Sequence, residues 1–212
     1  MPFSHRFFCL HFVPLLFLAI ALAGCGAPQK VEPLAKPLAP APPPDYSVGD
    51  EFVYSIGGGS MEDIHRVVSV GEKNVIFQSS RVFGTITQPK AFSNPINYTG
   101  GTFAPFYEVT LTTDLAGLFP LEVGKSVSGV GSGRFNTGTV SVAYGCDVVR
   151  QERIVVRAGA FDSFVVDCRM QPERGPVART VYWYAPEVGH FAAASRPGGH
   201  FHELARYTRA PR

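Results

Sequence analysis

The sequence predicts an all-β, mainly antiparallel domain: a single barrel, half-barrel or sandwich of about ten strands with at most one short helix. After residue 45, short runs of Val, Ile, Phe, Tyr and Thr alternate with polar residues at a period of two, which is typical of strands. Gly and Pro interrupt these runs at short intervals, as turns require. The 17 Phe and 8 Tyr suit a pleated core, and no apolar stripe of helical period follows residue 25.

The first half of this domain is predicted to be a meander. Strands are expected at 51–56, 61–70, 75–83 and 103–112. Gly57-Gly58-Gly59 and residues 71–74 supply the first two turns. Residues 113–118 predict one short helical turn, which Pro120 ends because proline cannot continue it.

The second half repeats the strand pattern at greater length. Strands are expected at 140–157, 161–170, 177–184, 191–195 and 200–208. The first of these is long, and Gln151-Glu152 predicts a bulge in it. Ala158-Gly159-Ala160 predicts the following turn, while Pro186 and Gly189 mark a break. The Gly-rich residues 129–133 are interpreted as a flexible connection between strands.

A short echo links the two halves. Val48-Gly49-Asp50 precedes the first strand of one half, and Val123-Gly124-Lys125 opens the other. Two interpretations stay open. The halves are a duplicated meander, or glycine at both places is the ordinary way for a chain to turn into a strand.

The N-terminus has the pattern of an export signal over residues 1–24. Arg6 and the start amine form a positive beginning, and residues 7–23 form an apolar stretch that is broken only by Cys9, His11 and Pro14. The stretch is near the lower length limit for a permanent membrane span, so an uncleaved anchor is the alternative. His11 and Pro14 weaken that alternative.

Leu22-Ala23-Gly24-Cys25 resembles the lipobox of bacterial lipoproteins. The resemblance implies cleavage between Gly24 and Cys25, a diacylglyceryl thioether on Cys25, and acylation of the new amine by a chain such as palmitate. Two or more acyl chains hold a protein stably on a bilayer. In enteric bacteria an Asp directly after the lipidated Cys keeps a lipoprotein in the inner membrane. Gly26 stands at that position here, which favours the periplasmic face of the outer membrane.

Residues 25–44 are predicted to be a tether ahead of a single domain at 45–212. Seven of the 18 residues from 27 to 44 are Pro, and four are Ala. Proline fixes φ and lacks a donor, so an extended spacer of polyproline type is expected. A proline-rich ligand for a partner domain is the alternative.

Four cysteines occur, at 9, 25, 146 and 168. Cys9 leaves with the signal and Cys25 takes the lipid. In an oxidising compartment the remaining pair predicts a Cys146–Cys168 disulfide, with two separately buried thiols as the rival. A turn centred near Gly159 would place Cys168 opposite residue 151. A bulge or packing across two sheets is then needed to bring Cys146 to it.

Catalytic and cofactor patterns are weak. His200 and His202 share a strand face, with His190 on the preceding strand, but no carboxylate joins them at a convincing spacing. Gly124-Lys125-Ser126 matches only the tail of a phosphate loop, because Phe119 stands where that loop needs glycine. We expect no catalytic residue, no metal and no cofactor. The net charge of +2 gives nucleic-acid binding no support.

Three segments resemble parts of uncharacterised bacterial envelope proteins. Residues 154–164 resemble their Val-Pro-Ala-Gly-x-Phe-Asp hairpin, although Arg157 stands where proline is usual. Residues 182–189, Tyr-Trp-Tyr-Ala-Pro-Glu-Val-Gly, resemble a strand end of the same proteins, and residues 119–125 are similar to their Pro-Leu-x-Val-Gly-Lys segment. Some of these proteins are similar to the open β half-barrels of lipoprotein carriers. The resemblance implies an envelope location and a β fold, without an activity.

Within this strand end, Trp183 has two interpretations: a core residue, or a platform on which a ligand stacks.

We therefore expect a non-enzymatic envelope lipoprotein, a tethered module that binds or scaffolds an envelope protein. The first alternative is a carrier whose curved sheet holds an apolar ligand such as an acyl chain. The second is a metal-dependent or hydrolytic enzyme. The membrane, through the lipid anchor, is the expected partner, together with an envelope protein or an apolar ligand.

Overall fold

The computed structural model describes residues 30–81, 84–90, 97–99, 107–112, 115–135, 138–196 and 201–212. The export signal, Gly24 and Cys25 therefore lie outside the described residues. Among those that are described, no helix is long and apolar enough to cross a membrane.

The described chain forms one antiparallel sheet of thirteen strands. The first seven are β1 Lys30–Glu32, β2 Glu51–Ile56, β3 Glu62–Val70, β4 Asn74–Ser79, β5 Gly84–Pro89, β6 Asn97–Thr99 and β7 Tyr107–Leu111. A 3-10 turn, η1 Leu115–Leu118, precedes the second group. That group is β8 Ser126–Phe135, β9 Gly138–Val156, β10 Gly159–Pro172, β11 Ala178–Ala185, β12 His190–Ser195 and β13 Phe201–Thr208.

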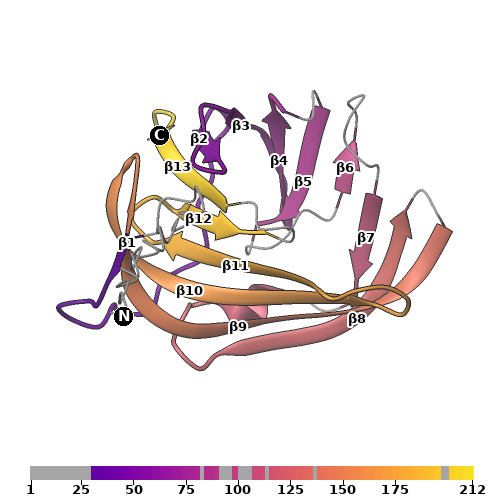
Figure 1. Ribbon diagram of the computed structural model, residues 1–212. Coiled ribbons are helices and arrows are strands. Elements are labelled where there is room, and N and C mark those ends of the chain that lie inside the picture. Colours follow the sequence, from indigo (N-terminus) through magenta and orange to yellow (C-terminus); the bar gives the residue numbers. More distant parts are fainter. Residues whose placement is uncertain are drawn as a thin grey trace, which may run out of the picture.

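The strands from β2 to β13 make a closed ring. Each pairs with the next along the chain, and β13 returns to pair with β2. β1 stands outside the ring, on the same edge of β9 that β8 occupies further along. Figure 1 shows β8 to β11 running across the molecule, with β2 to β7 standing over them. The predicted all-β, antiparallel fold is confirmed.

The interpretation of residues 129–133 as a flexible connection was wrong. They lie within β8, which pairs with β7 on one side and with β9 on the other. Val130 is exposed, whereas the glycines on either side of it are partly covered. Inward and outward residues thus alternate along β8 as in any strand. The inward positions are glycines, however, so the alternation of apolar and polar side chains that would indicate a strand is missing from the sequence.

Other boundaries also differ from expectation. The strand predicted at 75–83 ends at Ser79, and a separate strand, β5, follows at Gly84–Pro89. Residues 103–106 of the strand predicted at 103–112 lie outside the described part, and β7 covers Tyr107–Leu111. The expected helical turn is present as η1, whose Leu115 and Leu118 are buried.

The β9–β10 hairpin turns earlier than predicted. Val156 pairs with Gly159, so Arg157 and Ala158 form a two-residue loop, and Gly159 has φ of 138°. The bulge lies at Val149, because Val165 faces Arg150 while Val166 faces Val148. These two shifts bring Cys146 directly opposite Cys168, and a disulfide joins them.

The tip of this hairpin bends over β13. The Ala158 N–H donates to the Leu204 carbonyl at 2.9 Å. Arg157 contacts Glu203 at 3.0 Å and donates to the carbonyls of Gly58 and Gly59. Further along the hairpin, β10 is buried on both faces from Ser163 to Cys168.

The echo between the two halves is a repeat in the backbone. Gly49 has φ of 97° and its N–H donates to Val67 O at 2.9 Å; Val67 N–H in turn donates to Asp50 O at 2.8 Å. Gly124 has φ of 93°, and it and Lys125 exchange the same two bonds with Val148 at 2.9 and 2.8 Å. Each turn begins a run of six strands in the described ring, β2–β7 and β8–β13.

One continuous hydrophobic cluster fills the fold. Its largest fully buried members are Tyr54, Tyr182, Tyr184, Phe52, Phe77, Phe164, Leu118, Leu121, Ile154 and Leu204. Burying each such side chain contributes about 1.5–3 kcal/mol. The segments that lead into β2 and β8 also enter this cluster and pair with each other between Ala41 and Leu121.

Candidate functional site

The Pro-rich segment is attached to the ring over much of its length. We call residues 30–44 the strap. Its first part, β1, pairs with Arg153, Ile154 and Val155 of β9. Further along, Gln151 holds Leu38 from both sides: the Leu38 N–H donates to Gln151 Oε1 at 2.9 Å, and Gln151 Nε2 donates to Leu38 O at 3.3 Å.

The strap then enters the core. Ala41 is buried and exchanges two backbone hydrogen bonds with Leu121, at 3.1 and 2.8 Å. Pro44 is also buried. A free spacer over the whole of 27–44 was expected, whereas the structure places residues 30–32, 38, 41 and 44 against the domain. Proline is compatible with this because the strap lies on a sheet edge and in a loop, where few N–H donors are needed.

A buried ion pair fixes the chain between the strap and β2. We call this pair, Asp50 and Arg209, the latch. Asp50 is fully buried; its carboxylate accepts from the Ser47 and Ala210 N–H groups at 2.8 Å and lies 3.2 Å from Arg209. Arg209 also donates to Val188 O at 3.0 Å and to the carbonyl of Asp45. Gly189 has φ of 68°, and a Cβ there would come within 3.1 Å of Arg209 Nη1.

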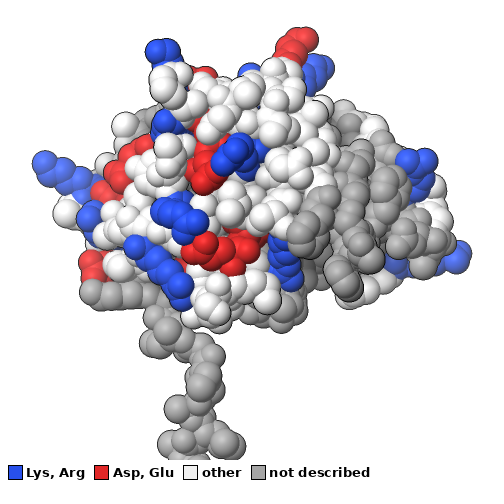
Figure 2. All heavy atoms as spheres, turned by 90° about the horizontal axis from the view of Figure 1, so that it is seen from above, with Lys and Arg blue, Asp and Glu red and all other residues white. Residues whose placement is uncertain are grey.

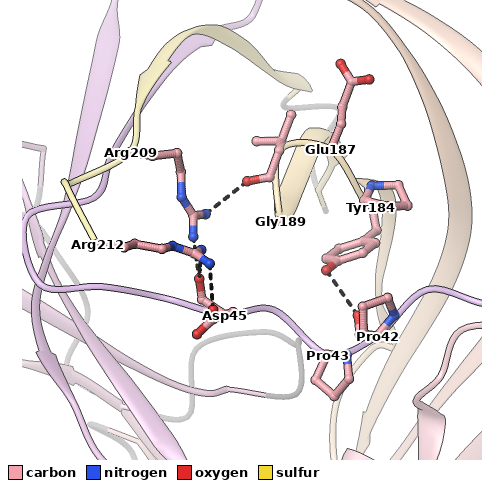
Figure 3. Close-up of a pocket in the computed structure, with 10 residues that line it drawn as sticks. Pro42, Pro43, Asp45, Tyr184, Glu187, Gly189, Arg209 and Arg212 are labelled. Carbon is pink, nitrogen blue, oxygen red and sulfur yellow. Dashed lines mark hydrogen bonds and ion pairs between the residues drawn. The ribbon is translucent and has the colours of Figure 1, made fainter.

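A pocket of about 290 Å³ lies between the strap, the β11–β12 turn and the C-terminal tail (Figure 3). We call it the strap pocket. It is lined by Pro42, Pro43, Asp45, Tyr184, Pro186, Glu187, Val188, Gly189, Arg209 and Arg212. Arg212 donates to the Asp45 carboxylate at 2.8 Å and to its carbonyl at 3.1 Å, and the Tyr184 hydroxyl donates to Pro42 O at 3.5 Å. The charged groups thus bind Asp45, the residue that follows the strap, to the C-terminal tail.

A histidine lies at the centre of the aromatic core. His190 is 1% exposed, and its Nδ1 is hydrogen-bonded to the Tyr46 hydroxyl at 2.8 Å. Its Nε2 has no hydrogen-bond partner among the described residues. Its ring lies 4.4 Å from the centroid of Phe52 and 4.3 Å from that of Phe191. Burial, helped by the charge of nearby cations, holds the pKa of His190 well below its usual 6.5. This ring is neutral at physiological pH.

A second polar group lies on β3 and β4. Asp63 Oδ2 is 2.9 Å from His65 Nε2, and the Ser79 hydroxyl donates to Asp63 Oδ1 at 2.8 Å. Burial raises the pKa of Asp63, but the His65 and Ser79 hydrogen bonds and the charge of His65 outweigh it and leave that pKa far below its usual value. The Asp63 carboxylate thus bonds to both the Ser79 hydroxyl and the His65 imidazole, whereas a serine nucleophile and its base need the hydroxyl on the imidazole.

No group of three or more His, Cys, Asp or Glu side chains in the described residues could hold a metal ion. Of the histidines that the sequence placed together, His200 lies outside the described residues. His202 is buried, and burial lowers its pKa to about 3, with Arg196 and His65 adding to the effect.

Trp183 is packed. It is 6% exposed, its Nε1 donates to Glu152 Oε1 at 2.6 Å, and its ring lies 6.1 Å from that of Phe201. The ring is therefore not open to a ligand that stacks on the surface.

Several charged side chains on the outer surface form ion pairs. Arg66 contacts Glu51 at 2.6 Å, and Arg206 contacts Glu62 at 2.9 Å. Figure 2 shows basic and acidic side chains interleaved over the face seen from above, so neither sign dominates it.

The sequence pattern missed the latch. Asp50 and Arg209 are far apart along the chain, and neither stands in a recognisable spacing. The one usable signal was Ser47-Val48-Gly49-Asp50, where an Asp after a Ser and a Gly is typical of a capped turn.

No family model matches the sequence, and no curated protein matches it. In fold the chain is similar to the hypothetical lipoprotein YmcC from Escherichia coli (K12), with a TM-score of 0.53 and 9% identity over 83% of this chain and 92% of that one. It is also similar to a suspected exported protein with a YmcC-like fold from Bacteroides fragilis (TM-score 0.47, 12% identity, 80% and 100% covered). A third is a suspected lipoprotein from Parabacteroides distasonis (TM-score 0.43, 11% identity, 81% and 100% covered). The first likeness shows the fold.

Proposed function

We propose that the protein is a lipid-anchored, non-enzymatic module of the bacterial envelope that binds or scaffolds an envelope partner. The observation that carries the proposal is the short interval between the lipobox and the fold. Leu22-Ala23-Gly24-Cys25 ends five residues before Lys30, where β1 begins. A lipid on Cys25 would therefore anchor the β ring through a linker of only a few residues. A protein of similar fold is described as a hypothetical lipoprotein, which agrees with the proposal.

The non-enzymatic part is supported by how the buried polar groups are used. Tyr46 is bound to His190, and Asp63 to His65 and Ser79. In both groups the buried polar side chains bond to one another inside the core, as structural polar groups do, although His190 Nε2 has no hydrogen-bond partner among the described residues. Gly26, which follows the predicted lipidation site, supports the periplasmic face of the outer membrane as the location.

The anchor is tested by two cysteine variants expressed in a bacterial host. Cys25→Ser removes the thiol that accepts lipid, and the protein should leave the mature, membrane-bound fraction and accumulate as precursor. Cys9→Ser is the matched control, because Cys9 leaves with the signal and its loss should change nothing. If the Cys25→Ser protein were processed and stayed in the membrane fraction like the wild type, the proposal would be wrong.

A further inference from the structure

We infer that the bilayer surface is the partner of the strap face: the β1 end of β9 lies against the lipid headgroups, and the ring does not hang free on a long spacer. This inference deepens the proposed function and rests on lipidation of Cys25. It concerns which surface of the protein meets the membrane, and it follows from the length of chain before β1 and from where the strap is attached.

The free leash is short. Five backbone steps join Cys25 to Lys30, and at about 3.3–3.6 Å per residue they reach at most roughly 18 Å. A folded domain of about 170 residues has a radius of gyration near 15 Å and is roughly 40 Å across. The leash is thus shorter than half the width of the domain, so the surface around β1 stays close to the headgroups.

The strap does not lengthen this leash while its contacts hold. β1 pairs with β9, Leu38 is bound twice to Gln151, and Ala41 is bound twice to Leu121. Without these contacts the free chain would run from Cys25 to Asp45. It would then be four times as long in residues as the segment from Cys25 to Lys30. The long spacer expected from the sequence would form only if the strap detached from the ring.

The exposed side of the strap suits a headgroup region. Residues 33–40 read Pro-Leu-Ala-Lys-Pro-Leu-Ala-Pro, so Lys36 is their only charge. Val31 is 45% exposed, and Pro33, Ala35 and Lys36 are exposed as well. Apolar side chains and a lysine are both tolerated at the membrane interface, where the lysine can meet anionic lipid.

Two exposed valines serve as markers, one at the end of β9 that is proposed to lie near the lipid headgroups and one at the end that is far from them. Val31 pairs with Ile154 of β9, whereas Val130 of β8 pairs with Ala143, eleven residues back along the same strand. At about 3.3 Å per residue the two positions are separated by roughly 36 Å along the strand. Val130 is 62% exposed, so both sites accept a small substitution without entering the core.

The test uses the lipidated, full-length protein in vesicles of phosphatidylethanolamine and phosphatidylglycerol. Val31→Cys and Val130→Cys each add one free thiol, because Cys146 and Cys168 are joined in a disulfide. Each thiol is labelled with a fluorophore and quenched by lipids that carry a nitroxide on the headgroup. Quenching at position 31 should exceed that at position 130 by at least about twofold.

A third protein carries the Val31→Cys label and about 20 Gly and Ser residues between Gly26 and Ala27, which add a reach of roughly 25 Å. Its quenching should fall toward that of position 130. Equal quenching at positions 31 and 130 in protein that floats with the vesicles would overturn the orientation and leave the anchor intact. Protein that does not float would overturn the anchor itself, and the orientation with it.

Discussion

Asp50 is a buried carboxylate that depends on one arginine. It is fully covered and lies 3.2 Å from Arg209, whose side chain is 24% exposed. We predict that Arg209→Ala lowers the free energy of unfolding by about 2–3 kcal/mol, because it leaves a buried charge without its partner. Urea denaturation measures the loss.

Arg212→Ala is the matched control. Arg212 pairs with Asp45, and both side chains are largely in water. An exposed pair contributes less than about 1 kcal/mol, so this variant should be close to the wild type. Equal losses for the two arginines would show that the buried position of Asp50 does not matter.

His190 and His202 predict acid sensitivity. Burial keeps both imidazoles neutral, and the pKa of His202 falls to about 3 from 6.5. The unfolded chain takes up these protons below about pH 6.5. The folded chain takes up the His202 proton only as the pH nears 3, and the His190 proton only at a pH well below 6.5. Stability is therefore complete above pH 6.5 and decreases as the pH falls through this window, by about 1.4 kcal/mol per pH unit for each histidine.

The check is a series of urea denaturation curves between pH 7.5 and pH 4. His202→Gln should reduce the slope of unfolding free energy against pH by about half, because one of the two histidines no longer titrates. A slope that is unchanged in this variant would mean that His202 is not held neutral by the fold.

Residues of this kind were the least predictable part of the site. Tyr46 and His190 are 144 positions apart, and Asp50 and Ala210 are 160 apart. The pattern of alternating residues assigns a residue to a strand face, but it cannot tell which distant side chain lies opposite. The packed position of Trp183 was one of two interpretations, and its burial together with its contact with Glu152 decides between them.

Among the elements, the β9–β10 hairpin was predicted correctly as two paired strands, but the predicted register of the pairing was wrong. The strands expected at 140–157 and 161–170 are present as Gly138–Val156 and Gly159–Pro172. Gly159 was taken as the centre of the turn, but its positive φ follows a two-residue loop at Arg157 and Ala158. A shift of this size changes which residues face each other, because strand pairing is counted outward from the turn.

The Cys146–Cys168 disulfide staples this hairpin. It closes a loop of 22 residues, and replacing both cysteines by serine should lower the free energy of unfolding by about 3 kcal/mol. Chemical denaturation with and without a reductant measures the effect. Reductant should bring the wild type to the stability of the double variant and leave the variant unchanged. A wild type unaffected by reductant that fully reduces the bond would contradict the prediction.

β8 shows why glycine misled the element assignment. Glycine normally weakens a strand, and five alternating residues with three glycines were interpreted as a connection. In the ring, β8 has a partner on each side, and these backbone hydrogen bonds hold it. The long-range pairing outweighs the local propensity.

For the whole molecule, the class of fold was predictable and the closure of the ring was not. Alternating residues and frequent turns indicate an antiparallel meander, and twelve of the strands in the described chain do follow each other in space. Closure depends on β13 meeting β2, which no local pattern reports. The attachment of the strap was hidden for the same reason, because proline content indicates an extended chain and not where that chain lies.

The central claim is that Cys25 carries lipid and begins the mature chain beside a folded ring. Its most direct test is the intact mass of the protein purified from native membranes. The account predicts the mass of residues 25–212 with the disulfide formed, increased by a diacylglyceryl group and, where the amine is acylated, by one further acyl chain. A mass that includes Met1, or an unmodified residue 25, would contradict it.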